Sequence, residues 1–270
     1  MLSNPKLSII TINYNDAAGL QKTIDSVIQQ TFFDFEYIVI DGGSKDGSLE
    51  VIKGGVDKID YWISEPDKGV YHAMNKGIIA AKGHYLLFLN SGDWFCNKES
   101  LSALANNTSD FDIIFGNNYY YYSEMKIEEN ELPDLITYNY LAYVNSIPHQ
   151  ASLIKRELFL KNGFYDENLK IVSDWKFFML SIFKWNATYV HVPKFICYYD
   201  FGGISSTNRL LADEEKKQLI AEEFFNFKYQ KEQMILIDKI LFYYKYSRLI
   251  RILKKFRIMK KFEYPKYLDF

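Results

Sequence analysis

The stretch Ser64–Asp93 reads SEPDKGVYHAMNKGIIAAKGHYLLFLNSGD and decides the fold class. Apolar residues recur at helical spacing from Val70 to Ala81, which predicts a helix with one side laid on a sheet. Gly83 marks the predicted end of that helix. The run Tyr85–Leu89 is continuously apolar, a pattern typical of a strand covered on both faces. Together the predicted helix and the predicted strand form one repeat of an α/β sheet.

Polarity returns abruptly after this strand, in the sequence Asn90-Ser91-Gly92-Asp93. In open α/β sheets, ligands bind just beyond the carboxyl ends of the strands. A carboxylate that follows a buried strand at that edge is well placed to hold a metal ion. We therefore expect Asp93 to be a metal ligand.

The same alternation extends back to the N-terminus. Strands are predicted over residues 7–13, 37–40 and 59–63, and an apolar stripe between residues 20 and 28 predicts a helix that Asp16 could cap. A further helix is predicted after Ser48, where Leu49, Val51 and Ile52 resume apolar character. With the helix and strand described above, the order β-α-β-α-β-α-β argues for a parallel, doubly wound sheet.

Glycines gather after the second of these strands, in Asp41-Gly42-Gly43-Ser44. They have neither the position nor the spacing of a dinucleotide fingerprint. The sequence also contains no G-x-x-x-x-G-K-[ST] phosphate loop and no G-x-S-x-G nucleophile elbow. These observations count against pyridine-nucleotide oxidoreductases, P-loop NTPases and α/β-hydrolases.

The pattern loosens after Asp93. A helix is predicted from Asp174, whose carboxylate would lie in the first turn, where the helix dipole favours negative charge. Residues 124–134 are acidic and are predicted to form a loop. The other predicted elements are helices at 100–104 and 156–160 and strands at 111–115, 117–122, 151–154, 189–193 and 195–199.

The composition is that of a folded protein rich in aromatic residues. Hydrophobic residues make up 48% of the chain, enough for a sizeable core, and aromatic residues make up 17%. Tyr and Trp suit sugar and base recognition, although an aromatic core would give the same share. Cys96 and Cys197 form no metal-binding or disulfide pattern, which fits a reducing compartment. The sequence shows no signal peptide and no run long enough to span a membrane.

Positive charge gathers near the C-terminus. Residues 239–268 carry ten Lys and Arg residues and one acidic residue, so the rest of the chain is net acidic. The chain is predicted to be helical from residue 210 to about 261, with an aromatic and aliphatic stripe in its basic part. Such a helix is typical of a membrane-surface element, and the stripe argues against nucleic acid as the partner. The alternative is a helix that packs on the body of the protein or on a second subunit.

Four segments, in order, resemble one known family. They are SIITINYN, YIVIDGGSKDGS, EPDKGVYHAMNKGI and YLLFLNSGD. Together they resemble the family 2 glycosyltransferases of the GT-A fold, and within them the bacterial branch that builds surface polysaccharides such as lipopolysaccharide or capsule. The resemblance covers residues 6 to about 205.

The resemblance implies a mixed α/β sheet flanked by helices, and inverting transfer of a sugar from a nucleotide diphosphate, UDP by family habit, to an acceptor hydroxyl. It implies one domain at 1–208, with a nucleotide-binding half at 1–95 and an acceptor-binding half at 96–208. A basic helical extension at 209–270 would follow. The acceptor in this branch is often a lipid-linked glycan, which would place the enzyme in the cytoplasm, on the inner face of the inner membrane. An oligomeric assembly stays open.

The resemblance also implies roles for single residues. Asp174 is the expected general base, and Asp93 is the expected ligand of Mg²⁺ or Mn²⁺. Tyr14 is expected against the base, and Asp41 is expected to accept a hydrogen bond from the base or ribose. The expected acceptor-binding residues are His149, Gln150 and Trp175. The full set of expected nucleotide-sugar-binding residues is Thr11, Asn13, Tyr14, Asp41, Asp67, Lys68, Asn75, Asn90 and Ser91.

One departure bears on the metal and on activity. The family motif usually carries two or three aspartates, whereas Asn90 and Gly92 bring no charge here. Asp93 is then the single anionic ligand of the motif, and the donor's phosphates would supply most of the coordination. The change supports, as an alternative, a non-catalytic module that binds nucleotide-sugar or a partner at the membrane. A nucleotidyltransferase is a third alternative, although the first strand lacks the basic phosphate loop of such enzymes.

Several of these residues also have purely structural alternatives. Asp41 could cap a turn, and Asp174 could cap its own helix. His149 could be a loop histidine satisfied by its neighbours, and Trp175 could be a core residue.

Overall fold

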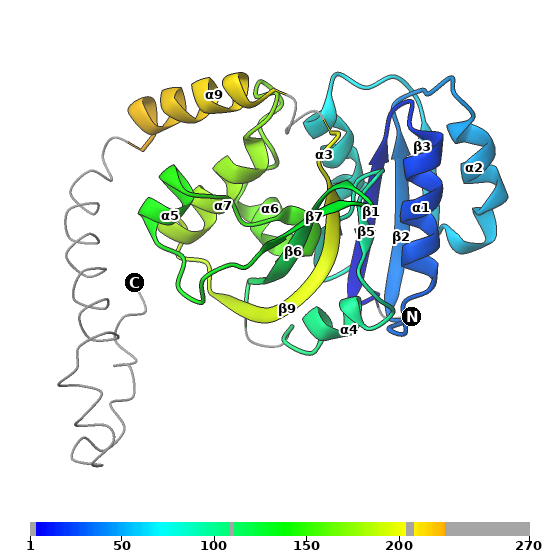
Figure 1. Cartoon of the computed structure of the whole chain (residues 1–270), viewed down its shortest axis with the longest axis horizontal. Helices are drawn as coiled ribbons and strands as arrows, with labels where there is room; N and C mark the ends of the chain where they lie inside the picture. The colour runs from blue at the N-terminus through cyan, green and yellow to red at the C-terminus, as the bar shows by residue number, and fades with distance from the viewer. Residues whose placement is uncertain (1–3, 109–110, 204–207, 225–270) are drawn as a thin grey trace, which may run out of the picture.

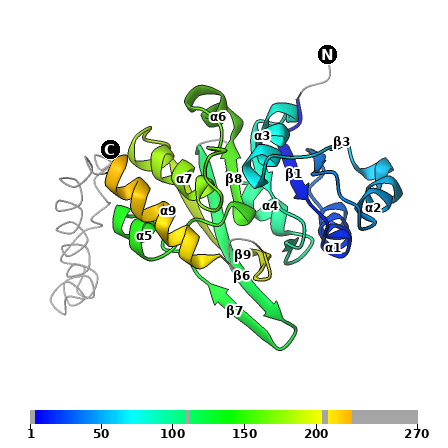
Figure 2. The same ribbon diagram turned by 90° about the horizontal axis from the view of Figure 1, so that it is seen from above.

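The structure is a computed structural model that describes residues 4–108, 111–203 and 208–224. Within these residues, one nine-stranded mixed sheet carries helices on both faces (Figure 1; Figure 2). The strand order is β3-β2-β1-β4-β8-β6-β9-β5, and β7 pairs with β6. The expected mixed α/β architecture is confirmed.

The first half of the chain builds the parallel part of the sheet. β1 pairs in parallel with β2 and β4, and β2 pairs in parallel with β3. Asp16 caps the first helix, because its Oδ1 accepts the backbone N–H of Gly19 at 3.0 Å. The predicted β-α-β-α-β-α-β order is confirmed. The elements are β1 (Leu7–Asn13), α1 (Ala17–Ile28), β2 (Phe35–Asp41), α2 (Ser48–Gly54), the 3-10 turn Val56–Lys58, β3 (Tyr61–Ser64), α3 (Val70–Ala80) and β4 (Tyr85–Phe88).

The second half adds antiparallel strands to the same sheet. β8 (Ser152–Lys155) is antiparallel to β4 and to β6 (Ile113–Ser123), and β9 (Tyr189–Asp200) runs parallel to β6. The end of β9 pairs with β5 (Trp94–Phe95), which directly follows Asp93. The other elements are α4 (Ser100–Ala105), β7 (Lys126–Asn130), α5 (Tyr138–Tyr143), the 3-10 turn His149–Ala151, α6 (Arg156–Asn162), α7 (Ser173–Phe183) and α9 (Arg209–Glu222).

Two hydrophobic clusters pack on opposite faces of the sheet. Neighbouring residues of a strand point to opposite faces, so Ile10 joins the cluster beneath α3, α6 and α7, while Ile9 joins the cluster beneath α1 and α4. Strands covered on both faces explain the continuous apolar runs in the sequence. Leu219 of α9 and Phe224 are buried in the first cluster. The chain after residue 208 therefore begins as part of the same packed body.

Two predictions of secondary structure were wrong. Residues 126–130 form β7 rather than a loop, because they pair with the second half of β6 as an exposed edge strand, which tolerates acidic side chains. The paired short strands expected at 111–122 and at 189–199 are two long strands, β6 and β9. The register between them shifts around Gly116 and Asn117, and irregularities of this kind interrupt the sequence pattern of a strand.

Gly83 has a different role from the one predicted. α3 ends at Ala80, and Ala81 after it has an extended backbone. A Cβ on Gly83 would lie 2.5 Å from the backbone carbon of Leu7 and the backbone nitrogen of Ser8. Glycine is needed here because the chain passes close to β1, and it does not end the helix.

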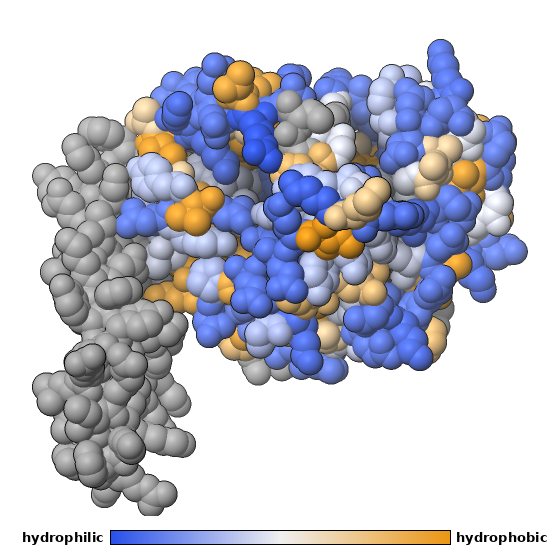
Figure 3. All heavy atoms as spheres, in the orientation of Figure 1, coloured by the Kyte–Doolittle hydropathy of each residue, from blue (hydrophilic) through white to orange (hydrophobic). Residues whose placement is uncertain are grey.

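The described surface on the face in Figure 3 is mostly hydrophilic, with apolar side chains scattered over it. The predicted basic amphipathic helix within residues 239–268, and its contact with a membrane, lie outside the described residues. Among the helices of the described ranges, none combines the length and the apolar character needed to cross a membrane.

Candidate functional site

A cavity of about 870 Å³ lies at the carboxyl ends of β1, β2 and β4. Asn13, Gly42 and Asn90, which end or follow these strands, form one side of it. Residues of the second half, among them His149 and Asp174, form the other side. This is the edge at which open α/β sheets bind ligands.

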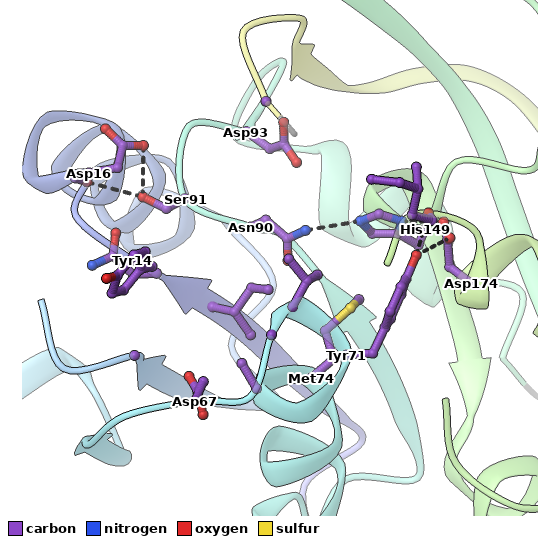
Figure 4. A pocket seen from close by; sticks show the side chains of 18 of the residues that line it. Tyr14, Asp16, Asp67, Tyr71, Met74, Asn90, Ser91, Asp93, His149 and Asp174 are labelled. Atoms are coloured by element: carbon purple, nitrogen blue, oxygen red, sulfur yellow. Dashed lines mark hydrogen bonds and ion pairs between the residues drawn. The ribbon is translucent and has the colours of Figure 1, made fainter. Parts of the chain in front are cut away.

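Ten of the predicted site residues line this cavity. Figure 4 shows Tyr14 and Asp67 towards one end and Asp174 towards the other, with Asn90 between them. The lining residues are Asn13, Tyr14, Asp67, Lys68, Asn90, Ser91, Asp93, His149, Gln150 and Asp174. The predicted residues that are not part of its described lining are Thr11, Asp41, Asn75 and Trp175.

One end of the cavity contains an exposed tyrosine ring and a carboxylate that two side chains of α3 hold in place. Tyr14 is 69% exposed, and an exposed ring can stack on a base. Asp67 contacts Lys76 Nζ at 2.5 Å and His72 Nδ1 at 3.1 Å, both from α3. A Cβ on Gly42 would lie 3.0 Å from the Tyr14 ring and 3.2 Å from Asp67 Oδ2. Glycine at this position therefore keeps open the space between the ring and the carboxylate.

Asp41 lies beneath the cavity rather than in its wall. Its Oδ1 accepts from Asn13 Nδ2 at 2.7 Å and from Ser44 Oγ at 2.5 Å. Its Oδ2 accepts from Ser64 Oγ at 2.6 Å and from the backbone N–H groups of Gly43 and Ser44. Burial works to raise the pKa of Asp41, but these hydrogen bonds outweigh it and hold the pKa below its usual value. A carboxylate has about four lone-pair positions, so Asp41 has none left for a base.

Asn13 connects Asp41 to the cavity. It lines the cavity wall, and its Nδ2 donates to Asp41 and to Ser44 Oγ. Asp41 therefore fixes the orientation of a side chain that does reach the ligand space.

Thr11, Asn75 and Trp175 point into the core and have structural partners there. Thr11 Oγ1 donates to the carbonyl of Leu89 at 2.7 Å. Asn75 Nδ2 donates to the carbonyl of Tyr165, and Asn75 Oδ1 accepts the backbone N–H of the same residue. Trp175 is 1% exposed, and its Nε1 donates to a backbone carbonyl of α5. In this geometry the three side chains support the structure around the cavity, and the ligand contacts expected for them stay predictions.

Asp93 lies in the turn between β4 and β5, with its carboxylate fixed by β9. Its Oδ1 accepts the backbone N–H of Asp200 at 2.9 Å. Burial raises the pKa of Asp93 to about 7, against the N–H of Asp200 and the nearby His149, which lower it. Asn90 Oδ1 is a second buried oxygen in this wall, and no described residue donates to it. Such oxygens suit Mg²⁺ or Mn²⁺, although no three His, Cys, Asp or Glu side chains of the described ranges form a metal cluster.

Asp174 closes the other end of the cavity. Its Oδ2 lies 2.9 Å from His149 Nδ1, and its Oδ1 lies 2.9 Å from the hydroxyl of Tyr71 (Figure 4). The Tyr71 hydroxyl also lies 2.5 Å from the carbonyl of Ile171, so two acceptors share its single proton. On the other side of the imidazole, His149 Nε2 lies 3.2 Å from Asn90 Nδ2. One line of contacts therefore joins Asn90 to Asp174.

These contacts keep Asp174 ionised. Burial works to raise its pKa, but the hydrogen bonds of His149 and Tyr71 outweigh it and hold the pKa of Asp174 below its usual value. The N-cap of α7 is Val172, so Asp174 does not occupy the capping position. Its side chain is 17% exposed and lines the cavity. A carboxylate placed in this way can accept a proton from a ligand hydroxyl.

The cavity also contains polar side chains that the sequence analysis did not single out, among them Tyr71, Lys170 and Asp200. Asp200 directly follows the strand predicted at 195–199, and a carboxylate after a strand is the signal that marked Asp93. Tyr71 and Lys170 carry no such signal. They come from a helix and from the loop before α7, and their approach to the cavity depends on the tertiary fold.

The family model described as Glycosyl transferase family 2 matches residues 8–163. The chain belongs to glycosyltransferase family 2. The family and the transferase class expected from the four sequence segments are confirmed. Membership also sets aside the nucleotidyltransferase and the non-catalytic module.

Several curated relatives of this glycosyltransferase come from mycobacteria. An uncharacterized glycosyltransferase of Mycobacterium tuberculosis is 33% identical over 210 residues, which is 76% of this chain and 79% of the relative. A PGL/p-HBAD biosynthesis glycosyltransferase of Mycobacterium bovis is 30% identical over 215 residues, which is 76% of this chain and 81% of the relative.

Solved structures show the same fold. S. aureus TarS 1-349 in complex with UDP-GlcNAc aligns with a TM-score of 0.62 and 20% identity, over 80% of this chain and 71% of that chain. Against a longer TarS chain, the alignment spans 43% of the TarS length. The mannosyltransferase PcManGT of Pyrobaculum calidifontis, in complex with GDP-Man and Mn²⁺, aligns with a TM-score of 0.56 and 16% identity, over 73% and 57% of the two chains. The expected GT-A fold is confirmed.

Proposed function

We propose that this chain is an inverting glycosyltransferase that moves a sugar from a UDP-sugar to a hydroxyl group of a glycan or lipid-linked glycan. The observation that carries the proposal is the position of Asp174. An ionised carboxylate closes one end of a cavity whose other end holds Tyr14 and Asp67. A donor at Tyr14 and an acceptor at Asp174 would meet within one space.

The proposed reaction is a single displacement. An acceptor hydroxyl is a weak nucleophile until a positioned base removes its proton. Asp174 takes that proton while the acceptor oxygen bonds to the anomeric carbon, and the bond from that carbon to the diphosphate breaks. Attack opposite the leaving group inverts the anomeric carbon, and the step needs one base and no covalent enzyme intermediate. His149 and Tyr71 hold the carboxylate in place during this step.

The nucleotide would lie at the Tyr14 end. Its base would stack on the Tyr14 ring, in the space that Gly42 keeps open. Asp41 would act through Asn13, which it orients at the cavity wall. This assignment replaces direct reading of the base by Asp41, since the carboxylate has no acceptor position left.

The residues of the cavity can bind a divalent cation only when the phosphates of the donor supply further ligands. Asp93 and the unpaired oxygen of Asn90 would hold Mg²⁺ or Mn²⁺, with the donor's phosphates completing the coordination. The ion would supply stabilisation of the negative charge that develops on the diphosphate.

The comparisons support the choice of ligands in part. TarS structures contain UDP and UDP-GlcNAc, while PcManGT contains GDP-Man, so the base needs a direct test. The acceptor class draws support from the relative named for PGL/p-HBAD biosynthesis. We place the enzyme on the cytoplasmic face of the inner membrane through residues 239–268. Truncation before Lys239 should abolish binding to anionic vesicles, and unchanged binding would contradict this location.

A thermal-shift panel tests the donor. UDP, GDP, CDP and dTDP are each added with and without Mn²⁺, because a ligand that binds only the folded state raises its melting temperature. We expect UDP to give the largest shift and Mn²⁺ to increase it. Transfer from the UDP-sugar should then give a product whose anomeric configuration, read by NMR, is opposite to that of the donor. No shift with UDP, or a product with retained configuration, would contradict the proposal.

A further inference from the structure

α9 lies along α7 (Figure 2), and one of its carboxylates reaches the loop that precedes α7. Glu215 Oε1 accepts the backbone N–H of Lys170 at 2.7 Å. Glu215 Oε2 accepts the backbone N–H groups of Ile171 and Val172 at 3.0 and 3.2 Å. Three consecutive N–H groups therefore converge on one side chain. Negative charge near the N-terminus of α7 is also favoured by the helix dipole.

The loop held by Glu215 is part of the cavity. Lys170 and Ile171 line it, and the carbonyl of Ile171 lies 2.5 Å from the hydroxyl of Tyr71. The same hydroxyl lies 2.9 Å from Asp174, which follows the loop by two residues. The position of the loop therefore fixes both the backbone that carries Asp174 and the hydroxyl that contacts it.

Further contacts hold α9 and the two residues after it against the first turn of α7. Lys176 Nζ lies 2.5 Å from Glu223 Oε1, and Lys216 Nζ lies 5.4 Å from the centre of the Trp175 ring. The Phe224 ring meets Trp175 edge to face, with 5.9 Å between the ring centroids. Glu215 therefore belongs to a group of contacts between residues 215–224 and the N-terminal part of α7.

We propose that Glu215 is a positioning residue for the transfer reaction: it holds residues 170–172 so that Asp174 stays aligned with the acceptor hydroxyl. The inference rests on the proposed role of Asp174 as general base. The family model matches residues 8–163. The proposed positioning role therefore belongs to a helix outside the matched residues. The catalytic unit then extends through Glu222, past the domain boundary expected at residue 208.

Loss of the Glu215 carboxylate should lower turnover and leave donor binding unchanged. In Glu215→Ala, three N–H groups lose their acceptor, whereas Glu215→Gln keeps one carbonyl oxygen in place. Because a displacement of about 1 Å can reduce a rate about 100-fold, we expect kcat to fall about 10- to 100-fold in Glu215→Ala and less in Glu215→Gln. The affinity for UDP should match that of the wild type in both variants.

Hydrogen–deuterium exchange follows the loop independently of activity. A peptide covering residues 166–175 should exchange faster in Glu215→Ala than in the wild type. Glu214→Gln is the matched control, since it alters an exposed carboxylate of the same helix, and it should change neither exchange nor kcat. If Glu215→Ala does not fold, Glu215→Gln carries both measurements.

Faster exchange together with a lower kcat and unchanged UDP affinity supports the inference. The inference is overturned if Glu215→Ala shows the exchange or the kcat of the wild type. It is also overturned if kcat falls only as much as the affinity for UDP falls. Failure of the proposed function looks different. If the proposed function is wrong, Asp174→Asn would transfer sugar at the wild-type rate. If Asp174→Asn is inactive and Glu215→Ala is fully active, only the proposed role of Glu215 is wrong.

Discussion

His149 Nδ1 lies 2.9 Å from Asp174 Oδ2, and this contact lies at the end of the cavity that Asp174 closes. The other ring nitrogen of His149 lies 3.2 Å from Asn90 Nδ2, beside the loop that carries Asp93. The imidazole therefore connects the proposed base to the wall proposed to hold the diphosphate. A histidine with a purely structural role in a loop would make similar hydrogen bonds. The contribution of His149 to catalysis is therefore measured on the transfer reaction itself.

Removal of this imidazole should change the pH dependence of the reaction. The hydrogen bond from His149 lowers the pKa of Asp174 against burial, which raises it. In His149→Ala the pKa of Asp174 should therefore rise, and the pH below which kcat falls should move upward. Profiles of kcat from pH 4 to 9 measure the change, with His84→Ala as an exposed control. Identical acid limbs in His149→Ala and the wild type would refute this role.

Loss of the Tyr14 ring should weaken nucleotide binding. Stacking of a base on an aromatic side chain contributes about 1–3 kcal/mol by alanine substitution, so the Kd for UDP should rise about 5- to 150-fold in Tyr14→Ala. Tyr14→Phe keeps the ring and should bind nearly as the wild type does. Calorimetric titration with UDP measures both. Tyr61→Ala, 44% exposed and outside the cavity lining, is the control. Equal affinities of Tyr14→Ala and the wild type would exclude stacking.

Asp41→Asn should destabilise the fold. An amide group would turn N–H donors towards neighbours that already donate, and an unsatisfied buried group costs about 1–3 kcal/mol. The effect should depend on pH in a defined direction. Because the pKa of Asp41 is lowered in the folded state, its stabilisation is complete above the unfolded value of about 3.9 and is lost as the pH falls through the folded value.

Urea unfolding at several pH values tests this account of Asp41. The difference in unfolding free energy between wild type and Asp41→Asn should be constant near neutral pH and should shrink in acid. Asp57→Asn, at an exposed position, should give no difference. A variant as stable as the wild type at pH 7 would show that the hydrogen bonds to Asp41 contribute nothing.

The parallel half of the fold could be predicted from the sequence because buried strands read as continuous apolar runs. Leu7–Asn13 is buried along its whole length, and its predicted bounds match those of β1. β7 was missed because an exposed hairpin strand such as 126–130 carries no burial pattern.

Positions in the chain predicted which residues follow strands, but not which way their side chains point. Asn13 and Asp41 end neighbouring strands in direct register, yet only Asn13 lines the cavity. Trp175 follows Asp174 and points into the core instead. Glu215 was invisible to pattern analysis because its partners are backbone N–H groups more than 40 residues earlier.

The most direct test of the account is the transfer rate of Asp174→Asn. The amide keeps the shape of the carboxylate but cannot accept the acceptor's proton, so transfer should fall by about 100-fold or more. UDP affinity should equal that of the wild type, and Asp57→Asn should retain full activity. Transfer by Asp174→Asn at the wild-type rate would contradict the assignment of Asp174 as the general base.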